Sequence, residues 1–268
     1  MNYQALFTGW YTERKQQLER SIAATVANGN RVCERNWLKI LLRDTVLWLI
    51  QLVPSWKHWL ELGPRQNGMV RYEFEPGMTF LPKMGGGACF PQVYCVPLHS
   101  SGFDEDVESV AFTDDVIFAS HKRGLFQVAI LLDSDNEIQD AQAALADVDR
   151  LSDGEIFAEE ATFIVQDIPA GPTVFEVDSK SPLLNFEDKS MNLFRLASAS
   201  VFAQSRLCLN RPAPQYFDEY RIKKDLKGKK FVVLRPDRFV FAACTDKREL
   251  DEAVRQIPSI LNGHGSKS

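Results

Sequence analysis

The sequence lacks paired cysteines. Its cysteines are odd in number and none belongs to a Cys-x-x-Cys pair, which excludes the double-pair zinc sites and the dithiol redox sites. Scattered unpaired thiols are typical of a reduced compartment, so we expect a cytoplasmic protein. Cys89 and Cys95 lie close enough in sequence to bridge, but we expect both to be small buried apolar side chains. The five residues are Cys33, Cys89, Cys95, Cys208 and Cys244.

Metal-binding and phosphate-binding motifs are also missing. The four histidines are His58, His99, His121 and His264, and none has the spacing of a metal site. No Gly-x-Ser-x-Gly elbow of a serine nucleophile occurs. The glycine fingerprint that cradles a dinucleotide at a helix start is absent, and the triplet 85–87 predicts a plain loop. We therefore assign no catalytic, cofactor-binding or metal-binding residue from the sequence.

An excess of positive charge and a long uninterrupted apolar run are absent too. The net charge of −5 argues against a nucleic-acid partner. The most apolar stretch, 37–53, contains Lys39, Arg43 and Asp44, so we expect a buried helix that needs cover and no membrane partner. Residues 1–9 lack the basic start of a secretion signal, and we do not expect export.

What is present divides into two parts. Residues 1–75 form a predicted helical segment, in which helices over 11–27 and 37–53 are joined by a glycine turn at 28–30. Glycines, prolines and isolated aromatic residues between 63 and 97 indicate a domain junction.

Residues 76–268 alternate strand and helix signals and predict an α/β domain. A buried strand is predicted over 125–132, followed by a helix with one apolar face formed by Ile138, Ala141, Leu145 and Val148. Further predictions are a strand over 161–165, a helix over 191–207, and a hairpin of strands 231–234 and 239–243 joined by a turn that Pro236 presets. A last helix is predicted from Leu250 to Leu261, with Thr245 and Asp246 as its candidate N-caps.

Two adjacent carboxylates, Asp114 and Asp115, allow two interpretations. Like charges side by side can shift a pKa and take part in chemistry. The structural alternative is a turn or a helix cap. Thioredoxin-type chemistry needs a cysteine pair where the first strand meets its helix, and residues 133–136 are Asp, Ser, Asp and Asn, so no dithiol is available.

Several short segments resemble one family. They are Tyr11, Glu13 and Arg14 (YTER); Leu42, Arg43 and Asp44 with Pro54; Phe90 and Pro91; Thr113 to Asp115 (TDD); and Leu234 to Phe239 (LRPDRF). Over nearly the whole chain they are similar to the C-terminal part of class A FAD-dependent aromatic hydroxylases, the group of phenol hydroxylase and 3-(3-hydroxyphenyl)propionate hydroxylase. The chain departs from that family at Arg238, where the family hairpin usually has glycine, and in a longer spacing between Asp115 and Phe126.

The resemblance implies a fold and a role. It implies a thioredoxin-like domain without redox cysteines, which serves packing or dimerisation. The family's flavin-binding, NADPH-contacting and later flavin motifs would all lie before Met1, so FAD and NADPH belong to the complete enzyme and neither is bound by this chain alone. The implied partner is a flavin-domain polypeptide or a second copy. The apolar helix 37–53 would pack beneath the flavin and substrate domains.

Three hypotheses about function remain open. The first is the non-catalytic C-terminal portion of an FAD- and NADPH-dependent monooxygenase that hydroxylates an aromatic or polyketide-like substrate. The second is a stand-alone binding or dimerisation protein that kept the fold. The third is a non-redox biosynthetic enzyme, such as a decarboxylase or cyclase, which would draw on His99, His121 or the Asp114 and Asp115 pair.

Overall fold

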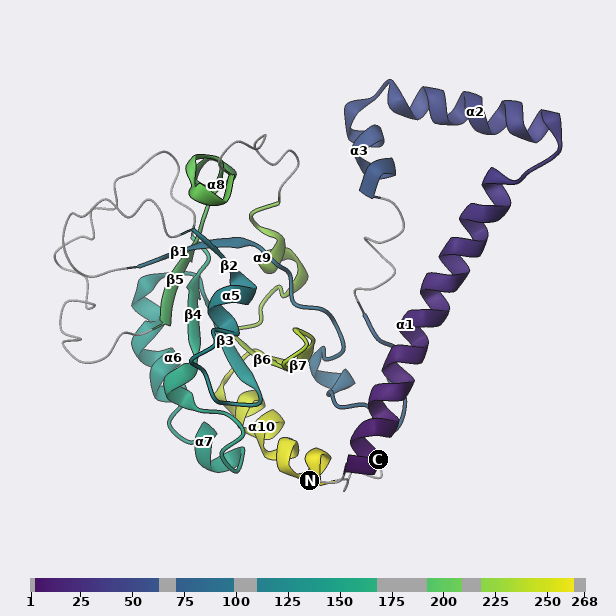
Figure 1. Cartoon of the computed structure of the whole chain (residues 1–268). Coiled ribbons are helices and arrows are strands. Elements are labelled where there is room, and N and C mark those ends of the chain that lie inside the picture. The colour runs from purple at the N-terminus through teal and green to yellow at the C-terminus, as the bar shows by residue number, and fades with distance from the viewer. Residues whose placement is uncertain (1–2, 63–70, 99–109, 168–191, 209–217, 263–268) are drawn as a thin grey trace. The chain divides into compact units, whose positions relative to one another are not determined.

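The computed structural model describes residues 3–62, 71–98, 110–167, 192–208 and 218–262 (Figure 1). The chain forms two compact units, Asn2–Met78 and Thr79–Ser268. The boundary predicted between residues 75 and 76 falls just before the end of the first unit. None of the helices in these ranges combines the length and apolar character needed to cross a membrane.

Three helices make up most of the first unit: α1 (Tyr3–Val32), α2 (Trp37–Gln51) and α3 (Pro54–Leu62). The predicted turn at 28–30 is wrong, because α1 continues through Gly29 and ends only after Val32. A single glycine costs a helix about 1 kcal/mol, which a long helix tolerates. The restart after Asn36 is confirmed, since its side chain accepts from the N–H groups of Leu38 and Lys39.

Residues 71–78 lie along one side of α1. Gly9 is in close approach to the backbone there, because a Cβ at this position would lie 2.2 Å from the carbonyl oxygen of Gly77. Gln16 donates to the carbonyl of Glu73 at 2.8 Å, and Arg20 pairs with the Glu73 carboxylate at 3.0 Å. Polar contacts therefore hold this segment against the helix.

The predicted helix over 37–53 is confirmed for Trp37–Gln51, but α2 contains no buried residue, so the prediction that this helix is buried is wrong. The apolar character of the segment is plain in its sequence. A helix that is apolar around most of its circumference needs other side chains packed on it, but the sequence does not show whether they come from the same molecule or from another.

The second unit is built on a mixed seven-stranded sheet with the order β2-β1-β5-β4-β3-β6-β7, which confirms the α/β class. Strands β3, β4 and β5 are parallel to one another, and the remaining neighbours are antiparallel. The strands are β1 (Tyr94–Pro97), β2 (Ala111–Phe112), β3 (Gln127–Leu132), β4 (Thr162–Val165), β5 (Asn192–Leu196), β6 (Phe231–Leu234) and β7 (Val240–Cys244).

Helices cover both faces of this sheet. Every residue of β3, β4, β6 and β7 is buried, as expected for strands covered on two sides. Ile117 of α5 (Thr113–Ile117) and Ile222 of α9 (Arg221–Asp225) pack in one core cluster with Leu131 of β3. Because neighbouring side chains of a strand point to opposite faces, Ile130 and Leu132 lie on the other side.

The second face is covered by α6 (Ile138–Ala144), α7 (Val148–Leu151) and α10 (Lys247–Leu261). The predicted apolar face of Ile138, Ala141, Leu145 and Val148 is buried, although the helix breaks between α6 and α7. The final helix is confirmed, with Asp246 as its N-cap. Its buried residues are Leu250, Ala253, Val254, Ile257 and Leu261.

The predicted helix over 191–207 is wrong in its first half. Residues 192–196 form β5, which pairs with β4 on one side and β1 on the other. The helical part begins only at Ala199, with α8 (Ala199–Gln204) and a 3₁₀ turn at Arg206–Cys208. Apolar residues there are spaced as in a helix, but the ladder bonds on both sides decide the conformation. Ser198, whose hydroxyl caps α8, was the local signal that marked the true helix start.

The loop 86–90 lies along the outer edge of β7. The N–H of Gly87 donates to the carbonyl of Val240 at 2.8 Å, and the N–H of Val240 donates to the carbonyl of Ala88 at 2.7 Å. The N–H of Phe90 reaches the carbonyl of Arg238 at 3.0 Å. The backbone groups of Val240 and the carbonyl of Arg238 on this edge are thus used within the protein.

Candidate functional site

The turn between β6 and β7 forms one wall of the candidate site. Pro236 presets the turn and the N–H of Arg238 donates to the carbonyl of Arg235 at 3.0 Å. Arg238 then has a φ of 70°, in the left-handed region, which this type of hairpin normally gives to glycine. The guanidinium of Arg235 holds Asp237 through two hydrogen bonds of 3.1 and 2.6 Å. The hairpin predicted from the sequence is therefore confirmed.

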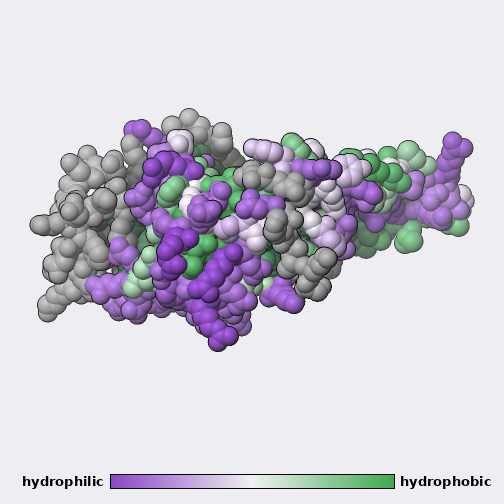
Figure 2. Space-filling model, turned by 90° about the horizontal axis from the view of Figure 1, so that it is seen from below, coloured by the Kyte–Doolittle hydropathy of each residue, from purple (hydrophilic) through white to green (hydrophobic). Residues whose placement is uncertain are grey.

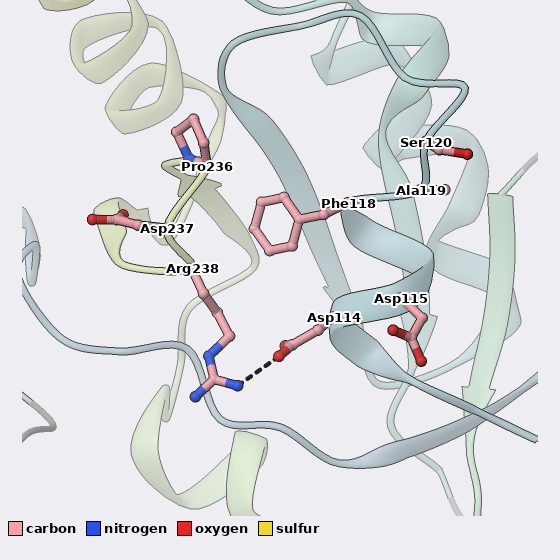
Figure 3. A pocket seen from close by; sticks show the side chains of 8 residues that line it. All are labelled: Asp114, Asp115, Phe118, Ala119, Ser120, Pro236, Asp237 and Arg238. Carbon is pink, nitrogen blue, oxygen red and sulfur yellow. Dashed lines mark hydrogen bonds and ion pairs between the residues drawn. The ribbon is translucent and has the colours of Figure 1, made fainter. Parts of the chain in front are cut away.

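Helix α5 forms the opposite wall. Together the two walls enclose an open depression of about 640 Å³ (Figure 3). Asp114, Asp115 and Phe118 line it from the helix and its end, and Figure 3 shows the Phe118 ring facing the hairpin while Asp115 projects away from Arg238. The remaining lining residues are Ala119, Ser120, Pro236, Asp237 and Arg238.

An arginine joins the two walls. Nη1 of Arg238 lies 2.5 Å from Oδ2 of Asp114, and two further guanidinium N–H groups donate to the sulfur of Cys89, each at 3.2 Å. Oδ1 of Asp114 is buried and has no hydrogen-bond partner among the described residues. Burial raises the pKa of Asp114, and the attraction of Arg238 offsets this only in part.

The depression is lined mainly by charged and polar groups. Its polar groups are three carboxylates, one guanidinium and the hydroxyl of Ser120, and no histidine or cysteine lines it. Two of the carboxylates are already engaged by arginines. The described part of the chain also contains no group of three or more side chains that could hold a metal ion.

The glycine triplet 85–87 lies in a packed loop. The N–H groups of Gly85, Gly86 and Gly87 donate to the carbonyls of Pro82, Leu81 and Val240, at 3.3, 2.9 and 2.8 Å. A phosphate cradle needs free N–H groups that point at the ligand. This triplet therefore offers no site for the diphosphate of a dinucleotide.

The other residues named from the sequence do not come together. His121 is exposed, and His99 and His264 lie outside the described residues. Asp114 and Asp115 occupy the first turn of α5, but only Asp114 meets Arg238. Cys95 is buried, and burial raises its pKa to about 12, whereas Cys89 is only half-buried, contrary to the prediction. None of the five cysteines, all within the described residues, forms a disulfide.

Lys122 is a perturbed residue that the sequence did not reveal. Its Nζ donates to Oγ1 of Thr162 at 2.6 Å and to the carbonyl of Ile117 at 3.0 Å. Burial lowers the pKa of Lys122 to about 8, although the charge of Glu160 opposes this. A single lysine within the run His121, Lys122 and Arg123 has no pattern that marks it as buried, so no sequence signal could have found it.

Glu160 organises the backbone beside this lysine. Its carboxylate accepts from the N–H groups of Arg123 and Gly124 at 2.7 and 2.9 Å. Burial opposes the charge, but these hydrogen bonds outweigh burial and lower the pKa of Glu160. Lys122 and Glu160 thus fasten the loop between α5 and β3 to the beginning of β4.

Comparisons with known proteins give no relative. No family model, no curated protein and no solved structure matches this chain.

Proposed function

We propose that this chain is the C-terminal, non-catalytic portion of an FAD- and NADPH-dependent monooxygenase that hydroxylates an aromatic or polyketide-like substrate. A flavin-domain polypeptide completes the enzyme and binds both cofactors, and FAD supplies the oxygen activation there. The family resemblance of the YTER and LRPDRF segments supports the flavin chemistry. The observation that carries the need for a partner is an exposed apolar stripe on α1.

That stripe runs along one side of α1 in two parts, separated by Arg14, whose guanidinium lies over the Trp10 ring at 5.9 Å from the ring centroid. Successive residues of a helix are rotated by about 100°, so positions three, four and seven apart lie on the same face. The members of this stripe are all more than half exposed. The opposite side includes Gly9 and Glu13, which are buried. In Figure 2, green apolar side chains are visible on the helical unit at the right of the view. The α1 stripe consists of Tyr3, Phe7, Trp10, Tyr11, Leu18 and Ile22.

The strand arrangement supports the thioredoxin-like part of the proposal. The stretch β4-β3-β6-β7 has a parallel pair followed by two antiparallel neighbours, and α10 follows β7. A strand–helix–strand unit followed by a strand–strand–helix unit is the order that a thioredoxin-like core requires. Asp133 and Ser134 follow β3, where a redox member of that fold has its cysteine pair.

The proposal is tested on the native protein in its own cell extract, by measuring the mass of its complex and the flavin bound to it. We expect the full chain to migrate with a larger, flavin-containing polypeptide, and to carry no stoichiometric FAD when purified alone. Trp10→Glu on the α1 stripe should release the flavin polypeptide. Asn30→Glu, which adds the same charge off the stripe, should not. A yellow, FAD-saturated isolated chain would overturn the proposal.

A further inference from the structure

Helix α2 has an exposed face that is almost entirely apolar. At 100° per residue, half of its circumference is formed by apolar side chains around a single polar one, Thr45. The half-buried positions Ile40, Arg43, Leu47 and Ile50 lie on the opposite side. The apolar side chains of this face are each at least 44 % exposed. This α2 face consists of Trp37, Leu38, Leu41, Leu42, Thr45, Val46, Trp48, Leu49 and the C-cap residue Leu52.

The polar groups near this face are already satisfied. The hydroxyl of Thr45 donates to the carbonyl of Leu41 at 2.8 Å, so its burial would leave no unpaired donor. Lys39 pairs with Glu34 at 3.3 Å, and Arg43 pairs with Asp44 at 2.8 Å. The α2 face therefore carries no charge that would select an oppositely charged partner, and two copies of it do not repel each other.

The order of side chains on the α2 face is symmetric about Thr45. Three residues away on either side lie Leu42 and Trp48, and four residues away lie Leu41 and Leu49. Seven residues away lie Leu38 and Leu52. A two-fold axis through Thr45, perpendicular to the helix, places each member of a pair opposite the other. Self-complementarity of this kind is what a symmetric dimer interface requires.

The size of the α2 face fits such an interface. Its apolar residues together expose on the order of 1,000 Å² per chain, with each tryptophan contributing well over 100 Å². The largest apolar patch on a typical monomer covers roughly 300–600 Å². A standard interface buries about 800 Å² on each partner. The face is therefore larger than a monomer tolerates and large enough for a stable dimer.

We propose that α2 is the contact between two copies of this chain, which pair antiparallel across a two-fold axis at Thr45. Leu38 of one copy packs against Leu52 of the other, and the two Thr45 side chains meet on the axis. This proposal differs from the packing beneath a flavin domain that the family resemblance implied for this helix. It does not depend on the proposed function, which concerns the α1 stripe.

Single cysteines test the direction of pairing. In the full chain with the exposed Cys33 replaced by serine, Thr45→Cys should give a disulfide-linked dimer under mild oxidation. Leu38→Cys alone and Leu52→Cys alone should not, because antiparallel pairing separates equivalent positions by roughly 21 Å. A mixture of the Leu38→Cys and Leu52→Cys chains should link. Linking of Leu38→Cys with itself shows parallel pairing and overturns the proposal, and the Cys33→Ser parent controls for the other cysteines.

Charge at the axis provides a second test. Thr45→Arg places two like charges together and should weaken dimerisation about 100-fold or more in sedimentation equilibrium. Gln51→Arg, with the same charge off the face, should leave the dimer intact, and circular dichroism checks that both variants keep their helices. A wild-type chain that stays monomeric at micromolar concentration overturns the proposal. So does a monomer recruited to phosphatidylcholine vesicles, which would identify a lipid surface as the occupant.

Discussion

Arg238 and Asp114 form an ion pair of 2.5 Å between the β6–β7 hairpin and α5, although the φ of 70° at Arg238 is one that favours glycine. A non-glycine residue in the left-handed region costs about 1 kcal/mol or more. The bonds to Asp114 and Cys89 compensate for that cost. The position therefore combines backbone strain with a contact that joins two elements far apart in sequence.

This compensation predicts different effects for two truncations. Arg238→Ala loses the guanidinium contacts and keeps the strain, so the free energy of unfolding should fall by about 1–2 kcal/mol. Arg238→Gly loses the same contacts and relieves the strain, so it should be about 1 kcal/mol more stable than Arg238→Ala. Urea unfolding of both variants measures the difference. Equal stabilities would show that the backbone at this position is not strained.

The raised pKa of Asp114 predicts that the stability of the protein depends on pH. Its pKa is raised in the folded state, so the folded protein binds more protons than the unfolded protein over the range above the ordinary value of 3.8. Stability from this group is present at low pH and is lost as pH rises through the folded pKa. Relative to wild type, Asp114→Asn should therefore gain stability as pH rises from about 4. If Asp114→Asn instead lost stability relative to wild type as pH rises, the effect of Arg238 on the pKa of Asp114 would outweigh that of burial.

The lowered pKa of Lys122 predicts that its contribution to stability rises with pH in the alkaline range. Its pKa of about 8 lies below the ordinary 10.5, so the unfolded protein binds more protons between these values. The slope is at most about 1.4 kcal/mol per pH unit, and stability rises with pH over this window. Wild type should therefore gain stability relative to Lys122→Met between pH 8 and 10.5.

The comparison of the Lys122 variant with wild type is needed because buried thiols oppose this trend. Burial raises the pKa of both Cys95 and Cys244 to about 12. These thiols keep their protons in the folded state and make stability fall as pH rises over much of the same range. Their contribution is common to both chains and cancels in the difference. A difference that stays constant from pH 8 to 10.5 would contradict the lowered pKa of Lys122.

Adjacent glycines of the 85–87 loop predict effects of different size. A Cβ at Gly86 would lie 2.4 Å from the carbonyl oxygen of Phe241, which is backbone and cannot rotate away. Gly86→Ala should therefore destabilise the fold by roughly 2–4 kcal/mol. Gly85→Ala meets only the Cβ of Ala243 at 3.8 Å and should cost about 1 kcal/mol for its φ of 73°. Thermal unfolding compares the two, and similar losses would contradict the close approach.

The sequence predicted the elements whose signals are local. The β6–β7 hairpin follows from a proline turn between two β-rich runs, and α10 follows from Asp246 and its apolar spacing. β5 was missed because its ladder partners lie far away in the chain. The wall-to-wall contact of Arg238 with Asp114 joins residues 124 positions apart, and no spacing rule places them together. The exposure of α2 could not be predicted either, because hydropathy indicates that a segment favours burial but does not show whether it is buried.

The loop along β7 limits how another molecule can approach this sheet. Exposed strand edges recruit further strands through their unpaired N–H and C=O groups, both in peptide recognition and in aggregation. Here Gly87 and Ala88 occupy both backbone groups of Val240 in β7, and Phe90 occupies the carbonyl of Arg238 just before the strand. A binding peptide could not pair with the backbone at the beginning of β7. Recognition there has to read side chains, which makes it sensitive to point substitutions rather than to the mere presence of an extended segment.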